Sequence, residues 1–469
     1  MDEKESKNED KPFTQNQISI LKQLPYSYGL IKTKDNVFEP VPFSVTPKYF
    51  QKDKLDDLIK CCLSFNECWP NLYSQFPKLI KFYKDLANKE ELVSIFSEIY
   101  EKTQQRIKRS PKPIILLIRN DFMYDESSKE FLQTEYNTMS VSGGLKSSTT
   151  TNLMKHFNSI WNDNKLNILS NNWKTYFQDS FDSFLNIYGN RSAYVLFFIS
   201  GTITCVIDFN FYESCLLEKG INCFRSSRWD FKKEDYSIDE KGNFIFKGRE
   251  IGVFFTRGFY DESHYDENVK ELFITVGTSN CLMLPSMESA LLNIKINQLL
   301  FFNKTVQKSY GLEGIDFKDF NKNLCPSYHI KTDFNNDKQK LIEFIGNRSK
   351  QYMLKTLKEG GFGGVFVGEK MIKFIKENNV ETLSLFLLVK KIEMPIQPSY
   401  FMVNNELIYL EKTKSELGHF STFIIVYEDN KYVLKKNFGE DLYLRTEQAN
   451  HYQKGMNKRT YYRDTIRLT

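Results

Sequence analysis

The stretch with the clearest capacity for chemistry is residues 355–368, where a lysine and a glutamate precede a dense run of glycines. Lys355 and Glu359 come first, and the glycines of the run are Gly360, Gly361, Gly363 and Gly364. Glycines let a backbone approach a ligand closely and direct its N–H groups toward an anion. A lysine and a carboxylate beside such a loop suit a phosphate group and its Mg²⁺. The pattern indicates a nucleotide-phosphate site, and a flexible glycine-rich hairpin is the alternative.

A second candidate site begins at Glu135. Glu135 and Asn137 alternate along a predicted strand, so both side chains lie on one face of it. Together they offer two oxygen ligands to a hard cation such as Mg²⁺. Ser140, Ser142 and the two glycines that follow offer hydroxyl and backbone N–H groups to an anion. An ordinary Ser/Gly turn after a strand is the alternative interpretation.

Three arginines are placed where they could bind a carboxylate or phosphate. Arg119 follows the apolar run Ile114–Ile118, which we expect to be a buried strand that ends there. Arg257 closes a second predicted strand, Ile251–Phe255, and the end of a strand in an α/β unit is where ligands bind. Arg445, near the C-terminus, could clamp a carboxylate with two hydrogen bonds, or it is an ordinary surface arginine.

The composition excludes several classes of protein. At 469 residues the chain is long enough for two or three domains, and its 40 Phe and 26 Tyr indicate a globular fold. The net charge of +5 combines 64 basic and 59 acidic residues, without the concentrated basic patch that nucleic-acid binding requires. The eight cysteines form no CxxC pair, so we expect reduced thiols rather than disulfides or a zinc site.

No membrane or export signal is apparent. The N-terminal segment is charged and lacks an apolar core. The longest apolar run, Ala193 to Ile207, is shorter than the roughly 20 residues of a membrane span. We expect a cytoplasmic protein with neither membrane nor nucleic-acid partners.

Both helices and strands are expected to position these residues. Helical patterns dominate from about residue 50 to 110, and one of them, Lys89–Arg106, is expected to begin with Asn88 as N-cap and Glu91 in a capping box. Segment 191–284 reads as a compact α/β unit. Its expected elements are the strands Ala193–Ile199, Ile251–Phe255 and Leu272–Val276 and the helix Phe211–Lys219.

The C-terminal third changes character. Ser286 to Phe302 is expected to be helical, and beyond residue 350 long β segments take over. These segments are Leu383–Ile392, Phe401–Leu410 and a hairpin Thr422–Lys435 that turns at Asp429-Asn430.

In their order along the chain, these motifs resemble those of the eukaryotic glutathione synthetase family. The ordered series is Arg119-x-Asp121-x-Met123, Glu135-x-Asn137, Ser140-x-Ser142, Arg257-x-x-Tyr260, Lys355 with Glu359-Gly-Gly, Ser415-Glu416-Leu-Gly-x-Phe420 and Leu444-Arg445-Thr446. The resemblance spans roughly residues 110 to 447.

The resemblance implies a mixed α/β fold of the ATP-grasp type with an inserted, small α/β substrate-binding domain. The corresponding division is a disordered tail 1–12, an ATP-grasp body 13–190, the inserted domain 191–284 and a C-terminal ATP-grasp part 285–469 with the glycine-rich loop. It further implies a homodimer that uses ATP and Mg²⁺ to join γ-glutamylcysteine to glycine. An acyl phosphate formed on the cysteine carboxylate would be displaced by the glycine amine, which requires positioning and charge neutralisation but no protein nucleophile.

Residue roles follow from the matching positions. The implied Mg²⁺ ligands are Glu135, Asn137 and Glu359. The implied nucleotide site comprises Glu135, Lys355, Glu359, Gly360, Gly361, Gly363, Gly364, Val389, Lys390, Lys391, Ile392 and Glu416. The implied peptide-substrate binders are Arg119, Ser140, Ser142, Arg257, Tyr260 and Arg445. Arg119, Arg445 and Lys355 are the residues expected to stabilise charge during phosphoryl transfer.

The sequence also departs from the family pattern. Met283 and Glu447 stand where the family has nucleotide-binding lysines, and Lys454 or Lys458 are candidates to replace the lost charge. Cys205 and Phe209 stand near positions that are polar in the family. Three hypotheses follow: a ligase of the glutathione synthetase type, an ATP-grasp ligase with another dipeptide or acceptor, and a non-catalytic paralogue. The last would bind a γ-glutamyl thiol peptide or pair with an active subunit.

Overall fold

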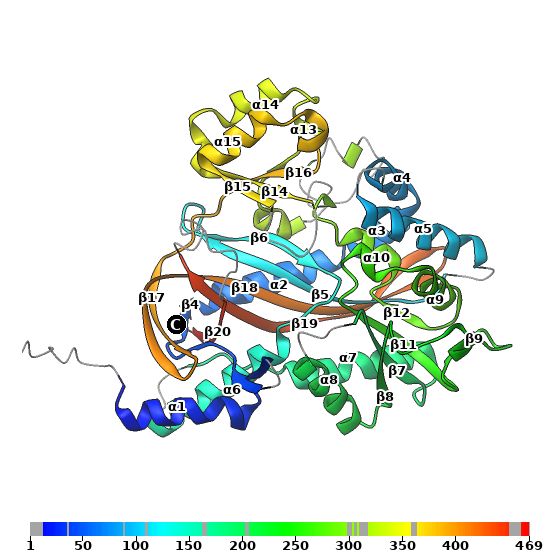
Figure 1. Ribbon diagram of the computed structural model, residues 1–469, viewed down its shortest axis with the longest axis horizontal. Coiled ribbons are helices and arrows are strands. Elements are labelled where there is room, and N and C mark those ends of the chain that lie inside the picture. The colour runs from blue at the N-terminus through cyan, green and yellow to red at the C-terminus, as the bar shows by residue number, and fades with distance from the viewer. Residues whose placement is uncertain are drawn as a thin grey trace, which may run out of the picture.

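The computed structural model describes residues 13–34, 37–87, 90–107, 111–161, 167–201, 206–297, 303, 307–308, 318–357, 364–449 and 461–468. Within these residues a seven-stranded sheet runs through the centre of the molecule (Figure 1). Its strand order is β17 (Gln397–Val403), β3 (Phe43–Ser44), β20 (Tyr462–Asp464), β19 (Lys431–Gln448), β18 (Glu406–Glu428), β5 (Ile114–Asp125) and β6 (Glu130–Asn137). We call it the main sheet.

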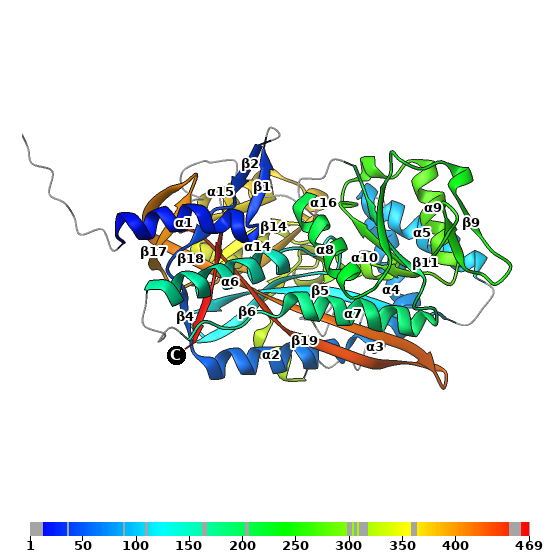
Figure 2. The ribbon, with the colours of Figure 1, turned by 90° about the horizontal axis from the view of Figure 1, so that it is seen from below.

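Helices cover both faces of the main sheet (Figure 2). On one face lie α2 (Lys52–Asn66) and α3 (Trp69–Ser74), and Trp69 packs on Phe423 of β18 at 5.6 Å between ring centroids. On the other face lie α6 (Gly144–Trp161) and α7 (Trp173–Tyr188), where Trp173 packs on Phe420 at 4.4 Å. Alternating β18 residues thus fill two aromatic cores.

A second sheet lies beside the main sheet and is built from strands between Tyr194 and Leu284. Its path is β8 (Cys223–Ser227), β7 (Tyr194–Ile199), β11 (Arg249–Arg257), β10 (Phe244–Phe246) and β9 (Tyr236–Ile238), and β12 (Leu282–Leu284) pairs with β11. Strands β7, β8, β11 and β12 are parallel, so their carboxyl ends share one edge. Helices α8 (Val206–Glu218) and α9 (Glu267–Thr278) flank this second sheet.

A third, smaller sheet sits above the main sheet (Figure 1). It has the order β13 (Ser327–Tyr328), β16 (Phe386–Lys390), β14 (Tyr352–Thr356) and β15 (Val365–Val367), with α14 (Lys338–Ile345) and α15 (Gly368–Glu377) packed on it. We call residues 318–390 the small unit. Its last strand leads through residues 391–396 into β17, and we call that connection the hinge segment.

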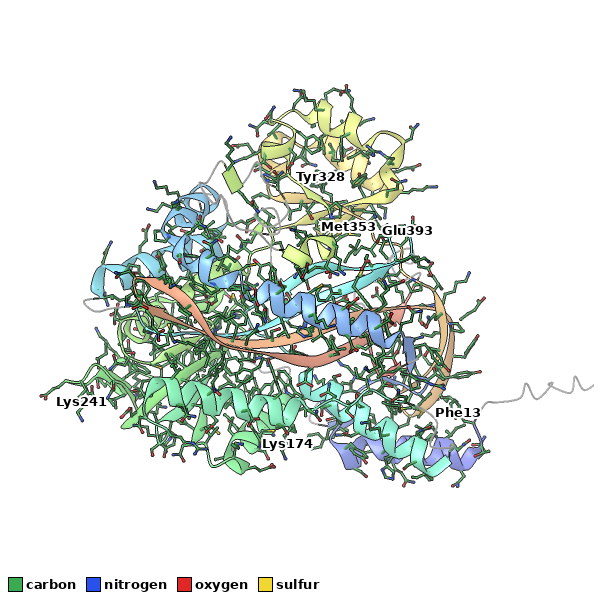
Figure 3. The ribbon with its side chains drawn as sticks, turned by 180° about the vertical axis from the view of Figure 1, so that it is seen from behind. Phe13, Lys174, Lys241, Tyr328, Met353 and Glu393 are labelled. Carbon is green, nitrogen blue, oxygen red and sulfur yellow. The ribbon has the colours of Figure 1, made fainter. Side chains whose placement is uncertain are left out.

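Asp125, at the end of β5, ties the hinge segment to the main sheet. Its carboxylate accepts hydrogen bonds from Lys390 Nζ at 3.1 Å and from the Glu393 N–H at 3.0 Å. Ser127 and Ser128 donate to the same carboxylate. Figure 3 labels Glu393 at this junction, below the small unit.

The remaining elements complete these layers. They are α1 (Gln15–Tyr28), β1 (Ile31–Lys34), β2 (Val37–Pro40), β4 (Lys48–Phe50), α4 (Phe76–Ala87), α5 (Glu91–Arg106), α10 (Met287–Leu292), α13 (Ile330–Asp333), α16 (Val380–Leu383) and β21 (Ile466–Leu468), with 3₁₀ turns at 233–235, 262–264, 318–323 and 346–351. None of the described helices is long and apolar enough to cross a membrane. The seven described cysteines carry free thiols.

Several expected elements are confirmed. The strand from Ala193, the strand that ends at Arg257 and the hairpin turn at Asp429-Asn430 all occur, and both turn residues have positive φ. The predicted strand Leu272–Val276 is wrong, because it lies inside α9. Val269, Leu272, Phe273 and Val276 form one buried helical face, and the Asp266 side chain caps the helix by accepting from the Val269 N–H.

Other boundaries also need correction. The strand that was expected to end at Arg119 continues to Asp125, because β18 and β6 pair with it on both sides through the polar residues. The predicted single β segment Phe401–Leu410 is interrupted by a tight turn at Asn404-Asn405. The end of β17 precedes this turn and the start of β18 follows it. Within the described part of 286–302, the helix ends at Leu292. Helix α5 takes Glu90 as N-cap without a side-chain hydrogen bond, and Asn88 lies outside the described residues.

Candidate functional site

One face of the main sheet carries a continuous set of charged and polar side chains, because directly paired residues of neighbouring strands share a face. The pairs that establish this are Asn137 with Arg119, Glu135 with Asp121, Glu416 with Arg445, Lys414 with Glu447, and Arg445 with Arg463. We call this set, with Tyr443, the charged face. Sequence segments almost 300 residues apart meet here, since Gly418 of β18 pairs with Asp121 of β5.

Arg119 and Asp121 form the centre of the charged face. Arg119 Nε and Nη2 donate to the two carboxylate oxygens of Asp121 at 2.6 Å each, and both residues are buried. Arg119 Nη1 donates to the Ser142 carbonyl at 2.8 Å. The arginine expected to bind substrate therefore also holds against the sheet the loop that carries Ser140 and Ser142, which we call the serine loop. Bidentate pairing fixes the plane of its guanidinium group.

Arg445 lies on the other side of Asp121. Its guanidinium is ion-paired with Glu416 and lies 3.8 Å from Asp121 Oδ2. It also covers the ring of Tyr461 at 4.6 Å from the centroid. Burial, together with the nearby Asp121 and Glu135 carboxylates, raises the pKa of Glu416 to about 7 despite Arg445.

Glu135 and Asn137 lie beside this pair on β6, as expected. Asn137 Nδ2 donates to Asp121 Oδ2 at 3.2 Å, which leaves its amide oxygen as an acceptor. Burial alone would raise the pKa of the Glu135 carboxyl. The positive charges of four residues outweigh that effect, so the net pKa lies below the ordinary range; they are Lys295, Lys355, Arg445 and Arg119. The fold thus brings Lys355, on β14 of the small unit, within electrostatic range of the Glu135 carboxylate.

The donor set fits a magnesium ion in part. Glu135 contributes a carboxylate kept ionised and Asn137 an amide oxygen, and hard cations prefer such ligands. Among the described residues no cluster of three His, Cys, Asp or Glu side chains has metal-binding geometry. Glu359, the third implied ligand, lies outside the described residues, as do Gly360, Gly361 and Gly363. Gly364 is described and packs against Thr356 of β14.

The serine loop joins the charged face to the second sheet. Ser140 adopts a positive φ of 49°, and its Oγ accepts a hydrogen bond from the Gly258 N–H at 2.7 Å. Arg257, at the carboxyl end of β11, donates to the Val141 carbonyl at 3.1 Å and is buried. The Arg257 guanidinium stacks over the ring of Phe209 at 5.3 Å. Phe209, near which the resemblance implies polar positions, therefore packs on this arginine.

The other predicted residues are more dispersed. Tyr260 lies two residues beyond Gly258 and is 46% exposed. Val389 and Ile392 are buried, Lys391 is exposed, and Lys390 is engaged with Asp125. Of the two lysines at the hinge end of β16, Lys391 is thus exposed, whereas Lys390 is held by Asp125.

The two departures from the family pattern have different structural settings. Met283 on β12 is 5% exposed and belongs to the core beneath the second sheet. Glu447 is buried and ion-paired with Lys414 Nζ at 3.1 Å, directly across the β18–β19 pair. The negative charge of Glu447 is therefore balanced within the protein. Cys205, Lys454 and Lys458 lie outside the described residues.

Residue-by-residue matching missed two members of the site. Asp121 received no role, although its spacing of two from Arg119 on a strand already places both on one face. Lys414 was missed because its relationship to Glu447 depends on the register of two strands, which spacing along one chain does not reveal.

Comparisons with known proteins agree with this architecture. A family model described as "Eukaryotic glutathione synthase, ATP binding domain" matches residues 15–460. Glutathione synthetase of Rattus norvegicus is 23% identical over 433 residues, which cover 90% of this chain and 89% of the rat protein. The chloroplastic glutathione synthetase of Solanum lycopersicum is 22% identical over 405 residues, covering 84% and 72% of the two chains.

A solved structure, that of a glutathione synthetase like-effector from Globodera pallida in its apo form, matches with a TM-score of 0.72 at 16% identity. The match covers 97% of this chain and 96% of that one. At this identity the likeness concerns the fold, and it confirms the mixed α/β, ATP-grasp-type architecture expected from the sequence. With a family model matched along nearly its whole length and a site assembled from the family's motif positions, the chain belongs to the eukaryotic glutathione synthase family.

Proposed function

We propose that this protein is an ATP-dependent ligase that joins γ-glutamylcysteine to glycine and uses Mg²⁺. The observation that carries the proposal is that groups from three elements distant in sequence act on one place: Arg445 lies 3.8 Å from Asp121, and Lys355 and Arg445 both lower the pKa of Glu135. The half-buried Glu135 carboxylate, kept ionised by cations, has no evident use in stability, because withdrawing a charge from water costs free energy. It suits a site that neutralises a nucleotide phosphate.

In this proposal the chain acts by positioning and electrostatics. Arg119 and Arg445 would stabilise negative charge as the γ-phosphoryl group moves to the cysteine carboxylate and as the glycine amine displaces phosphate. Arg119 uses three of its five N–H groups on Asp121 and Ser142, which leaves two for substrate. A Mg²⁺ ion held by Glu135 and Asn137 would supply further neutralisation of the phosphates. Lys355 would act from the small unit above.

The peptide substrate would lie between the serine loop and the second sheet. Ser140 and Ser142 are held there by Gly258 and Arg119, and Arg257 closes the back of the loop. The homodimer and the cytoplasmic location implied by the resemblance remain predictions.

Lys414 supports nucleotide use despite the replacement at Glu447. An unbalanced carboxylate within ~4–6 Å of a triphosphate would oppose binding by about 1–3 kcal/mol. Pairing with Lys414 cancels most of that repulsion. Met283 favours the second candidate, a non-catalytic paralogue, because a buried methionine cannot contact phosphate as the family's lysine does.

The decisive experiment is phosphate release by the purified protein with Mg-ATP, γ-glutamylcysteine and glycine, each left out in turn, with mass detection of the product. Glu135→Gln is the matched inactive control, since it keeps the shape and removes the charge. Release that requires all three components and yields a tripeptide supports the ligase. Dipeptide binding without release supports the non-catalytic paralogue, and release with another amino acid supports a different acceptor.

A further inference from the structure

The carboxyl edge of the second sheet carries an exposed tryptophan that neither the charged face nor the serine loop uses. Trp229 follows β8 and is 67% exposed, whereas the described side chains of Trp69 and Trp173 are buried. Tyr260, on the same edge after β11, is 46% exposed. A single exposed aromatic is ordinary, but two on the ligand-binding edge of a parallel sheet are not scattered at random.

A chain of contacts connects Trp229 to the serine loop. Gly201, just after β7, has a φ of 140°, and a Cβ there would lie 2.7 Å from Trp229 Nε1. Its neighbour Ser200 packs against Gly258, where a Cβ would collide with the Ser200 hydroxyl. Gly258 in turn donates to Ser140. Two glycines therefore bring the three turns into contact, and the aromatic surface continues directly from the proposed peptide site.

The tryptophan is also held in place before any ligand arrives. The Arg228 N–H donates to the Ile199 carbonyl at 3.0 Å, and the Trp229 N–H donates to Ser227 Oγ at 3.3 Å. The Arg228 guanidinium lies over the indole at 4.0 Å and donates through Nη1 to the Ser263 carbonyl. Arg228 Nε is buried and has no hydrogen-bond partner within the described part of the chain. One indole face is thus covered and polarised, and the ring presents the rest to solvent.

We infer that Trp229, with Arg228 and Tyr260, forms an additional subsite for an aromatic group carried by the peptide substrate. This inference rests on the proposed function, since it extends the proposed peptide site. A rigid indole stacks on aromatic rings at low entropic cost, and the guanidinium on its covered face holds the indole in place. The ring could come from a substituent on the thiol or from the side chain of an acceptor amino acid larger than glycine.

The test is a calorimetric titration of the full chain with four ligands. They are γ-glutamylcysteine, γ-glutamyl-S-benzylcysteine, γ-glutamylcysteinylglycine and γ-glutamylcysteinylphenylalanine. We expect at least one benzyl-bearing ligand to bind about ten-fold more tightly than its parent, which the stacking energy of an aromatic pair allows. The preferred pair reveals whether the ring is on the thiol or on the acceptor.

Variants separate the subsite from a general effect. Trp229→Ala should abolish the preference and leave binding of the parent peptide unchanged, and Trp229→Phe should keep most of it. Tyr26→Ala, which removes an exposed aromatic elsewhere, is the matched control and should have no effect. Equal binding of benzyl and parent ligands, or a preference that survives in Trp229→Ala, would overturn this inference alone. If γ-glutamylcysteine itself does not bind, the proposed peptide site fails with it.

Discussion

Arg119 and Asp121 stand two residues apart on β5 and share two parallel hydrogen bonds of 2.6 Å, in the interior of the molecule. The Asp121 carboxylate also accepts a hydrogen bond from Asn137 Nδ2 and lies next to the Arg445 guanidinium. One carboxylate thus orients Arg119 and lies 3.8 Å from Arg445, the second arginine proposed to act on the substrate. Its burial makes that arrangement rigid, because no water competes for its oxygens.

Arg119→Lys should lower kcat/KM by about 100-fold, because an ammonium group keeps the charge but loses the bidentate geometry. The variant should also be less stable by about 2–3 kcal/mol, since Asp121 would keep a single strong partner. Steady-state kinetics and urea unfolding measure the two effects. Arg191→Lys, at a surface arginine paired with Asp182, is the control that should change neither. Full activity in Arg119→Lys would contradict this role.

The Lys414–Glu447 pair predicts that replacing either residue changes the KM for ATP, and in opposite directions. Lys414→Met would remove the ammonium group that lies 3.1 Å from the Glu447 carboxylate and should raise the KM for ATP, whereas Glu447→Lys should lower it. Both single variants should be destabilised without nucleotide, by about 3 kcal/mol, because each breaks a largely buried ion pair. Mg-ATP should restore stability to Glu447→Lys in particular, as seen in thermal unfolding. Lys412→Met, on the same strand but exposed, serves as the control. Equal KM values for ATP in all variants would contradict the proposal that Lys414 balances the charge of Glu447 near the nucleotide.

Met283→Lys should fail to restore the family's nucleotide contact. Met283 is packed in the core under the second sheet, so the new ammonium would be buried among apolar side chains. We expect a loss of several kcal/mol in the free energy of unfolding. Chemical denaturation compared with Met283→Leu, which keeps the volume, measures it. A stable lysine variant with a lower KM for ATP would show that this position faces the nucleotide after all.

Asp125 predicts a separate effect on the hinge segment. Asp125→Asn should loosen the contact with Lys390 and Glu393 and destabilise the protein by about 2–3 kcal/mol. Burial alone would raise the pKa of Asp125. Hydrogen bonds to its carboxylate outweigh that effect and lower the pKa to about 2; they come from Ser127, Glu393, Lys390 and Ser128. The stabilisation is therefore present above the ordinary pKa of 3.8 and is lost as the pH falls through about 2.

Hydrogen exchange of residues 386–397 should accelerate in Asp125→Asn, while exchange in α7 should not change. Ser128→Ala removes one neutral hydrogen bond from the same carboxylate and should show a smaller effect. Unchanged exchange in the hinge segment would mean that the tie does not restrain the small unit.

His419 predicts how stability falls in mild acid. It is fully buried on β18, and burial lowers its pKa from the ordinary value of 6.5 to about 4. Because the folded-state pKa is depressed, the stabilisation is complete above pH 6.5 and is lost as the pH falls toward 4. Unfolding free energies between these values should decline by up to about 1.4 kcal/mol per pH unit more in the wild type than in His419→Gln. Parallel pH profiles for the two proteins would contradict a buried neutral imidazole.

Local patterns were sufficient where one element determines the outcome. Alternation along β6 correctly places Glu135 and Asn137 on one face, and the turn at Asp429-Asn430 follows from residues that tolerate positive φ. The error at Leu272–Val276 is of the opposite kind. A short apolar window matches a strand as well as a helix, and only the longer spacing from Val269 and the cap at Asp266 separate the two.

Relationships between strands were beyond the reach of local patterns. The charge of Arg445 is visible in the sequence, but its partner Glu416 is identified only by the pairing of β18 with β19. The continuation of β5 beyond Arg119 has the same origin, because pairing on both sides holds polar residues in the strand. Ordered motifs could place the residues in a family, but their balance of charge emerges from tertiary structure.

The strand order of the main sheet also determines when the molecule becomes complete during synthesis. Ile114 of β5 pairs with Ile425, and Phe43 of β3 pairs with Arg463 close to the C-terminus. Contacts over such separations form slowly and require almost the whole chain to have left the ribosome. The second sheet, by contrast, is formed by strands within residues 194–284 and packs against α5 and α7, which precede it in the chain, so it can assemble while translation continues. A nascent chain therefore acquires the edge that carries Trp229 well before it acquires the charged face, and an interrupted chain would carry the first without the second.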